Sequence, residues 1–179
     1  MKSWRMPSMP EIIFDTCVLS NFALSGAFPL LKSLYANAAF ITDMVALENL
    51  RGIRKGHAPL VAVKEALAVG WLREASCASP EEKRLFETLS VSLGIGEASC
   101  IAVARHRGYV FACDDRAARK EAALCGVRLT GTVGILIKSV KMGEVNLRNA
   151  NGILKKMVEQ GFYAPVERLT KEMTGIDGH

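Results

Sequence analysis

Several acidic residues directly follow short apolar runs, at positions where a carboxylate would be unfavourable without a structural or chemical role. Asp15 ends the stretch "IIFD", and Asp114 and Asp115 come directly after "YVFAC". Burying an unpaired charge is costly, so such a residue either caps a following helix or takes part in chemistry. Taken singly, each of the three fits a helix cap, because aspartate is favoured at that position.

Two glutamates in apolar surroundings extend this set. Glu48 lies in "TDMVALENLRG" and Glu97 in "LGIGEASCIAVARHRG", where Gly94 and Gly96 allow a close approach of the backbone. Carboxylates gathered in one place repel one another unless a cation lies among them, and hard divalent ions such as Mg²⁺ and Mn²⁺ prefer carboxylate and water oxygens. The alternatives are an ion pair between Glu48 and Arg51 and a favourable first-turn charge for Glu97.

The elements that must position these acids are short strands alternating with longer amphipathic helices. Strands are expected at 11–14, 39–42, 109–113 and 127–129, which are rich in aromatic or β-branched residues. Strands separated by helices predict an α/β fold, a three-layer α/β/α sandwich with a central, mostly parallel sheet. Ligands of such sheets bind outside the carboxyl ends of the strands, which is where Asp15 and Asp114 are expected. The predicted helices span 17–24, 27–36, 43–54, 58–69, 80–92, 96–106, 115–125 and 131–141, with Asp43 and Thr132 as N-caps.

Length and composition favour one domain with a sizeable core. The chain has 179 residues, of which 50% are hydrophobic, and no apolar run reaches the roughly 18 residues that span a bilayer. The start "MKSWRMPSMPE" lacks the apolar segment of a signal peptide, and five cysteines without a C-x-x-C pair indicate reduced thiols. We therefore expect a cytoplasmic protein without membrane association. The net charge of +5 is compatible with an anionic partner such as RNA.

The ordered set of motifs resembles the PIN-domain proteins, a nuclease fold that includes the VapC-type toxins of toxin–antitoxin systems. The matching pieces are "IIFDTCVLSNF", "ALENL", "GEASCIAVA", "ACDDRAARKEAALCGV" and "TGTVGIL". The resemblance is strongest to the prokaryotic branch with "G-E-A-x-x-I-A" followed by "D-D-R-x-A-R". We expect residues 11–142 to form the nuclease domain and 143–179 to be a helical appendage of it, with a helix at "LKKMVEQGF".

The resemblance implies a hydrolase, an endoribonuclease that cleaves RNA phosphodiester bonds with Mg²⁺ or Mn²⁺. Residue by residue, the family's four acidic positions match Asp15, Glu48, Glu97 and Asp114, the expected catalytic residues. The expected metal ligands are Asp15, Glu97, Asp114 and Asp115, supported by the polar residues Thr16, Asn21 and Thr132. Ser99 departs from the family pattern, because many relatives carry a second acid at this position. The number of bound metal ions, one or two, therefore stays open.

Other chemistries find weaker support. The three histidines lack metal-ligand spacing, and "LGIGEA" lacks the lysine and the length of a phosphate-binding loop. Cys17 stands where a haloacid-dehalogenase phosphatase would need a second aspartate. Basic residues near the acidic edge could flank an RNA path or form ordinary solvated helix faces; they are Arg51, Arg54, Lys55, Arg116, Arg119 and Lys120.

Three functions stay open. The first is an endoribonuclease, including the toxin of a type II toxin–antitoxin pair, whose partners would be RNA and an antitoxin protein. The second is a non-catalytic PIN-like module that binds RNA or protein, which Ser99 and the cysteines near the acids would suit. The third is a nuclease that cleaves DNA. Apolar stripes at 58–69 and 131–157 suit either a homodimer or the core of one chain.

Overall fold

The computed structural model describes residues 9–175. The N-terminal segment in which we read no signal peptide lies largely outside these residues, as do the last four residues of the expected appendage.

The described residues form a five-stranded, all-parallel sheet flanked by helices, which confirms the predicted fold class. The strand order is β3-β2-β1-β4-β5, so the chain reverses its direction of winding at β1, between β2 and β4. A crevice at such a reversal is where open α/β sheets bind ligands. The strands are β1 (Ile12–Phe14), β2 (Ala39–Thr42), β3 (Leu72–Ala75), β4 (Val110–Ala112) and β5 (Leu129–Thr130).

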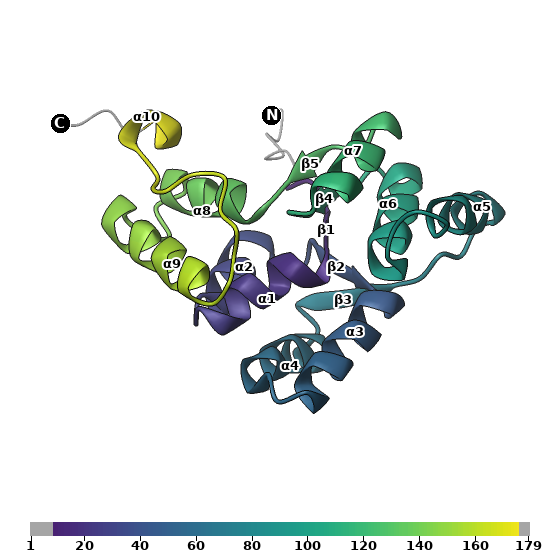
Figure 1. Cartoon of the computed structure of the whole chain (residues 1–179), viewed down its shortest axis with the longest axis horizontal. Coiled ribbons are helices and arrows are strands. Elements are labelled where there is room, and N and C mark those ends of the chain that lie inside the picture. The colour runs from purple at the N-terminus through teal and green to yellow at the C-terminus, as the bar shows by residue number, and fades with distance from the viewer. Residues whose placement is uncertain (1–8, 176–179) are drawn as a thin grey trace, which may run out of the picture.

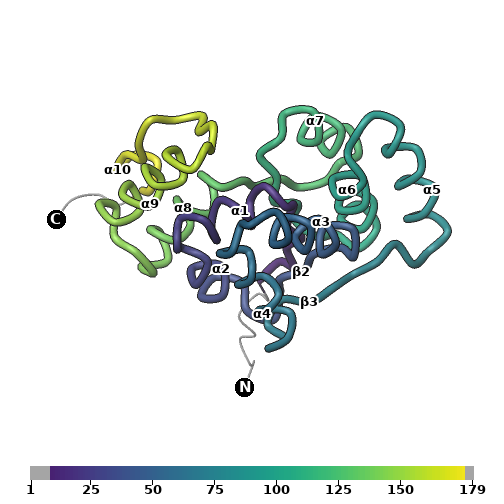
Figure 2. Tube along the Cα trace, turned by 60° about the horizontal axis from the view of Figure 1, so that its bottom comes forward, coloured from purple at the N-terminus to yellow at the C-terminus, as the bar shows by residue number. Residues whose placement is uncertain are grey.

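The helices form two layers around this sheet (Figure 1). On one side, α6 packs against β1, β2 and β4, and α5 and α7 pack against α6. On the other side α1 contacts α2, α4, α8 and α9, while α3 contacts both α1 and α6. Figure 2 shows α8, α9 and α10 grouped at one end of the molecule and α5 at the other. The bounds are α1 (Thr16–Leu24), α2 (Phe28–Tyr35), α3 (Asp43–Arg54), the 3-10 turn η1 (Ala58–Leu60), α4 (Val61–Val69), α5 (Pro80–Leu89), α6 (Ile95–Arg107), α7 (Arg116–Leu124), α8 (Thr132–Lys141), α9 (Leu147–Glu159) and α10 (Lys171–Thr174).

The core explains why the central elements are so apolar. All three residues of β1 are buried, as expected for a central strand covered on both faces. Helix α6 is buried from Ala98 to Ala104 without interruption, because it lies between the sheet and α5. A helix surrounded in this way is apolar all round rather than along one stripe.

Three local predictions were wrong. Strand β3 was missed because its sequence "LREA" exposes Arg73 and Glu74 at the sheet edge and lacks an apolar run. Thr42, not Asp43, caps α3, since its hydroxyl accepts a hydrogen bond from the Val45 amide at 3.2 Å. Thr132 is the first residue of α8 rather than its cap.

No single helix within residues 9–175 combines the length and apolarity needed to cross a membrane. Helices α1 and α2 meet that test only as a pair, across a bend of 120°.

Candidate metal centre and adjoining cavity

Strand register decides which residues meet at the carboxyl edge of the sheet. In the parallel pair of β1 and β4, Phe14 lies opposite Ala112, and the Asp15 amide donates to the Ala112 carbonyl at 2.9 Å. Asp15 therefore lies level with Cys113, and Asp114 lies one residue further along. The sequence indicated the correct edge, but the register makes Cys113 the direct neighbour of Asp15.

Asp15 is both a helix cap and a buried acid. Its side chain accepts a hydrogen bond from the Cys17 amide at 3.4 Å at the start of α1, and only 2% of the residue is exposed. The pKa of Asp15 is raised to about 7. Burial is the largest cause, the negative charge of Glu97 comes next, and the charge of Glu48 has a smaller effect. A nearby cation would stabilise the ionised form of this carboxyl group, which burial disfavours.

Asp15, Glu97 and Cys113 form the tightest group of metal-binding side chains in the described part of the chain. One ligand atom from each, two carboxylate oxygens and one sulfur, lie within 4.8 Å of one another. Burial raises the pKa of Glu97, and so does the charge of Asp115. Two carboxylates fit a divalent cation such as Mg²⁺ or Mn²⁺, and the softer sulfur would be better matched to Mn²⁺ than to Mg²⁺.

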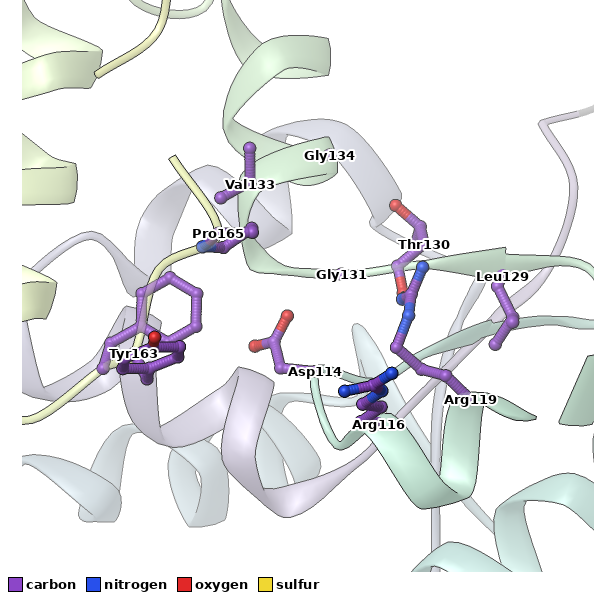
Figure 3. Close-up of a pocket in the computed structure, with 11 residues that line it drawn as sticks. Asp114, Arg116, Arg119, Leu129, Thr130, Gly131, Val133, Gly134, Tyr163 and Pro165 are labelled. Atoms are coloured by element: carbon purple, nitrogen blue, oxygen red, sulfur yellow. The ribbon is translucent and has the colours of Figure 1, made fainter. Parts of the chain in front are cut away.

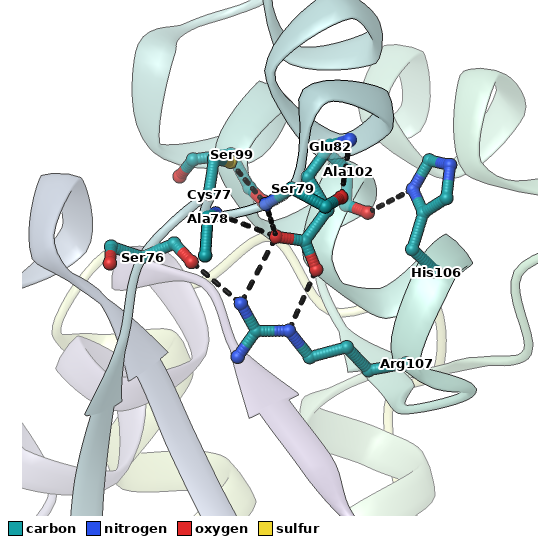
Figure 4. Close-up of polar contacts among 9 residues, drawn as sticks. All are labelled: Ser76, Cys77, Ala78, Ser79, Glu82, Ser99, Ala102, His106 and Arg107. Atoms are coloured by element: carbon teal, nitrogen blue, oxygen red, sulfur yellow. Dashed lines mark hydrogen bonds and ion pairs between the residues drawn. The ribbon is translucent and has the colours of Figure 1, made fainter.

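Helix α6 presents Glu97 from its first turn, and an ion pair with the buried Glu82 fixes this helix to α5. The Arg107 guanidinium binds Glu82 at 2.7 Å, and Glu82 also accepts hydrogen bonds from the Ala78 and Ser79 amides (Figure 4). The Arg107 hydrogen bond is the main reason that the pKa of Glu82 is lowered to about 2. These contacts join the two ends of the α5–α6 hairpin.

Asp114 lies beside the group of Asp15, Glu97 and Cys113, but its carboxylate is hydrogen-bonded to the start of α8. Its carboxylate accepts hydrogen bonds from the Thr132 amide at 2.9 Å, from the Thr132 hydroxyl at 2.6 Å and from Asn21 at 3.2 Å. Asn21 also donates to the Thr132 hydroxyl at 3.0 Å. A Cβ atom at Gly131 would lie 2.6 Å from Asp114 Oδ1, so glycine makes room for this carboxylate. The carboxylate thereby replaces the side-chain cap that α8 lacks.

Glu48 is oriented by Thr16 and fits closely against α6. The Thr16 hydroxyl donates to Glu48 Oε2 at 2.5 Å. A Cβ atom at Gly96 would lie within 3.0 Å of three atoms of the Glu48 carboxylate. The charge of Glu48 contributes to the raised pKa values of both Asp15 and Glu97, which places it in the same acidic group.

Asp115 and Ser99 have structural partners of their own. Asp115 caps α7 by accepting a hydrogen bond from the Ala118 amide at 2.8 Å. Its negative charge also raises the pKa of Glu97. Ser99 is buried and hydrogen-bonds Thr42 and the Gly96 carbonyl, both at 2.7 Å. Serine at this position thus joins α6 to the end of β2.

A cavity of about 660 Å³ opens next to Asp114. In Figure 3 the Asp114 carboxylate lies between Tyr163 and Pro165 on one side and Arg116 and Arg119 on the other. Of the six basic residues named from the sequence, only Arg116 and Arg119 line this cavity. Arg119 Nη1 also donates to the Cys113 and Thr130 carbonyls at 2.7 and 2.8 Å, which ties α7 to β4 and β5.

Three residues of this region were not expected in these places from the sequence: Cys113 as a metal-binding side chain, and Tyr163 and Pro165 in the cavity wall. Cys113 directly precedes Asp114 in the sequence, but its place beside Asp15 follows from the register of β1 and β4, which the sequence does not show. Tyr163 and Pro165 come from the segment after α9, and no motif in "FYAPVE" indicates that it returns to the sheet edge.

Fold and acidic edge agree with the outcome of a comparison with protein families. A family model described as a PIN domain matches residues 11–175. The chain therefore belongs to the PIN-domain family, whose fold is a nuclease fold. No curated protein matches the chain.

Proposed function

We propose that this PIN-domain protein is a metal-dependent endoribonuclease. The observation that carries the proposal is the convergence of mutually repelling acids, the buried Asp15 among them, at the strand-order reversal. Asp15 and Glu97 form one group with Cys113, Glu48 and Asp115 lie close enough to raise pKa values in that group, and Asp114 lies beside them. An apolar core tolerates such an arrangement poorly unless a cation completes it.

The residues of the site divide into ligands and supports. Asp15 and Glu97 would hold the ion, with Asp114 or Cys113 at a further position. A bound divalent ion would lower the pKa of a water molecule and neutralise charge on the scissile phosphate. Thr16 fixes one oxygen of Glu48, which leaves the other to accept a hydrogen bond from the attacking water. Thr132 and Asn21 fix Asp114 in one orientation.

The proposed reaction is hydrolysis. A water molecule loses a proton as its oxygen forms a bond to phosphorus, the bond from phosphorus to one ester oxygen breaks, and the leaving oxygen takes up a proton. No nucleophilic side chain is required. The thiols of Cys17 and Cys113 have raised pKa values, mainly through burial and then through the charge of Asp15, so neither is activated as a nucleophile.

We further propose that the nuclease is of the VapC type, acting as a toxin held by an antitoxin protein, and that it forms a homodimer. The order of the acidic motifs supports the VapC assignment, and the apolar stripes at 58–69 and 131–157 would supply the contact surface of the homodimer.

The test is cleavage of labelled single-stranded RNA by the purified chain with Mn²⁺ and with EDTA. We expect cleavage with Mn²⁺ only, and loss of most activity in Asp15→Asn and Asp114→Asn, which remove charge with little change of shape. Equal cleavage in EDTA, or near-wild-type cleavage by both variants, would refute the proposal.

A further inference from the structure

The cavity beside Asp114 combines an aromatic ring with basic side chains. Tyr163 is 96% exposed, the most exposed large apolar side chain among residues 9–175. It lies across the cavity from Arg116, which is exposed at the start of α7 (Figure 3). Phe162, Pro165, Leu129 and Val133 complete an apolar lining.

This lining fits an unpaired nucleobase. An exposed tyrosine ring offers a face on which a base can stack, and single-stranded nucleic acids are commonly bound in this way. A cavity of about 660 Å³ is within the range of small-molecule sites. A paired base would not fit the role, because both of its faces are covered by its neighbours in the duplex.

The surrounding charges indicate where a phosphate of the bound strand would lie. Arg116 supplies a guanidinium group that can bind a phosphate with two parallel hydrogen bonds, and Arg119 is fixed at the wall by two backbone carbonyls. Asp114 faces the same cavity from the acidic group. A base on Tyr163 would therefore leave its own phosphate between Arg116 and the proposed metal site.

We propose that this cavity is a nucleobase subsite, in which Tyr163 stacks on an unpaired base next to the scissile phosphodiester and Arg116 binds the adjoining phosphate. The subsite rests on the proposed nuclease function for its biological meaning, but its binding chemistry can be measured without cleavage. It makes the segment after α9 a part of substrate recognition.

The experiment uses a short single-stranded oligoribonucleotide carrying 2-aminopurine, whose fluorescence falls when it stacks, titrated with the full chain in EDTA. We expect quenching by the wild type, an affinity lower by about tenfold in Tyr163→Ala, and near-wild-type binding in Tyr163→Trp, which keeps an aromatic face. Arg116→Ala should lower the salt dependence of binding by about one phosphate contact, whereas Arg148→Ala, an exposed change outside the cavity, should not.

Several results would overturn the subsite. These are unchanged binding and quenching in Tyr163→Ala, equal binding of the same sequence as a duplex, or displacement of the strand by an equal concentration of free AMP, which would indicate a mononucleotide site. The proposed function fails separately. If the quenching depends on Tyr163 but Mn²⁺ produces no cleavage, the subsite stands and the nuclease assignment falls.

Discussion

The carboxylate of Asp114 and the first residue of α8, Thr132, are joined twice, through the Thr132 amide at 2.9 Å and its hydroxyl at 2.6 Å. Thr132 is completely buried, so its hydroxyl serves Asp114 and Asn21 rather than solvent. One residue thus links the end of β4 to α8 and limits the orientations that Asp114 can adopt.

Thr132→Val should weaken metal binding more than it weakens the fold. Valine keeps the shape and the amide bond but leaves Asp114 without its hydroxyl donor, and loss of such supporting bonds typically costs about 10-fold or more in metal affinity. Calorimetric titration with Mn²⁺ measures the effect. Thr88→Val, which removes an exposed hydroxyl bonded to Arg84 on α5, is the control. Equal Mn²⁺ affinity in the two variants would show that the Thr132 hydroxyl does not support a ligand.

Gly96→Ala should lower activity while leaving the protein folded. Alanine is the better helix former by about 1 kcal/mol, but its Cβ would lie 2.8 Å from Glu48 Oε2 and would displace the carboxylate from Thr16. Gly152→Ala, in α9 with no atom near the added Cβ, should be stabilised without loss of activity. RNA cleavage and thermal melting of both variants provide the measurement, and full activity in Gly96→Ala would contradict the assigned place of Glu48.

Glu82 should contribute stability that disappears in acid. Its folded-state pKa of about 2 lies below the ordinary value of 4.5, so the unfolded chain binds the proton more tightly. The contribution is therefore complete above about pH 4.5 and is lost as the pH falls toward 2. Glu82→Gln should lower the free energy of unfolding by about 2–3 kcal/mol at neutral pH, and the difference should shrink in acid.

The matched control for Glu82 lies on the same helix. Glu81 pairs with Arg84 on the surface, where both side chains are more than half exposed, and such pairs contribute little. Urea unfolding of Glu82→Gln and Glu81→Gln across this pH range should separate them. If the difference in the free energy of unfolding between Glu82→Gln and the wild type did not change with pH, the charge of Glu82 would not be the cause of the stabilisation.

Particular elements show what the sequence could and could not reveal. The apolar runs of β1, β2 and β4 and the glycine at the end of α6 located these elements, because burial and left-handed backbone have clear residue preferences. Strand β3 has only four residues, two of them charged and exposed, so its existence depends on pairing with β2. The position of Cys113 beside Asp15 depends on the register between β1 and β4. The position of Tyr163 depends on the path of the segment after α9, which brings it to the cavity beside Asp114.

The central claim, that Asp15 helps to hold a divalent cation, also predicts an unusual stability ranking. Its folded-state pKa of about 7 exceeds the ordinary 3.8, so the folded protein holds this proton more tightly than the unfolded chain. Without metal, ionising Asp15 therefore lowers the free energy of unfolding as the pH rises from about 4 to about 7. Asparagine does not titrate and remains a good helix cap.

The decisive measurement is the melting temperature of wild type and Asp15→Asn in EDTA and in Mn²⁺, slightly above neutral pH, with the exposed Glu11→Gln as a control. In EDTA we expect Asp15→Asn to be more stable than the wild type by at least ~1 kcal/mol, and Glu11→Gln to match the wild type. Mn²⁺ should raise the melting temperatures of the wild type and Glu11→Gln by mass action and should reverse the ranking with Asp15→Asn. Equal increases in wild type and Asp15→Asn would contradict the metal site.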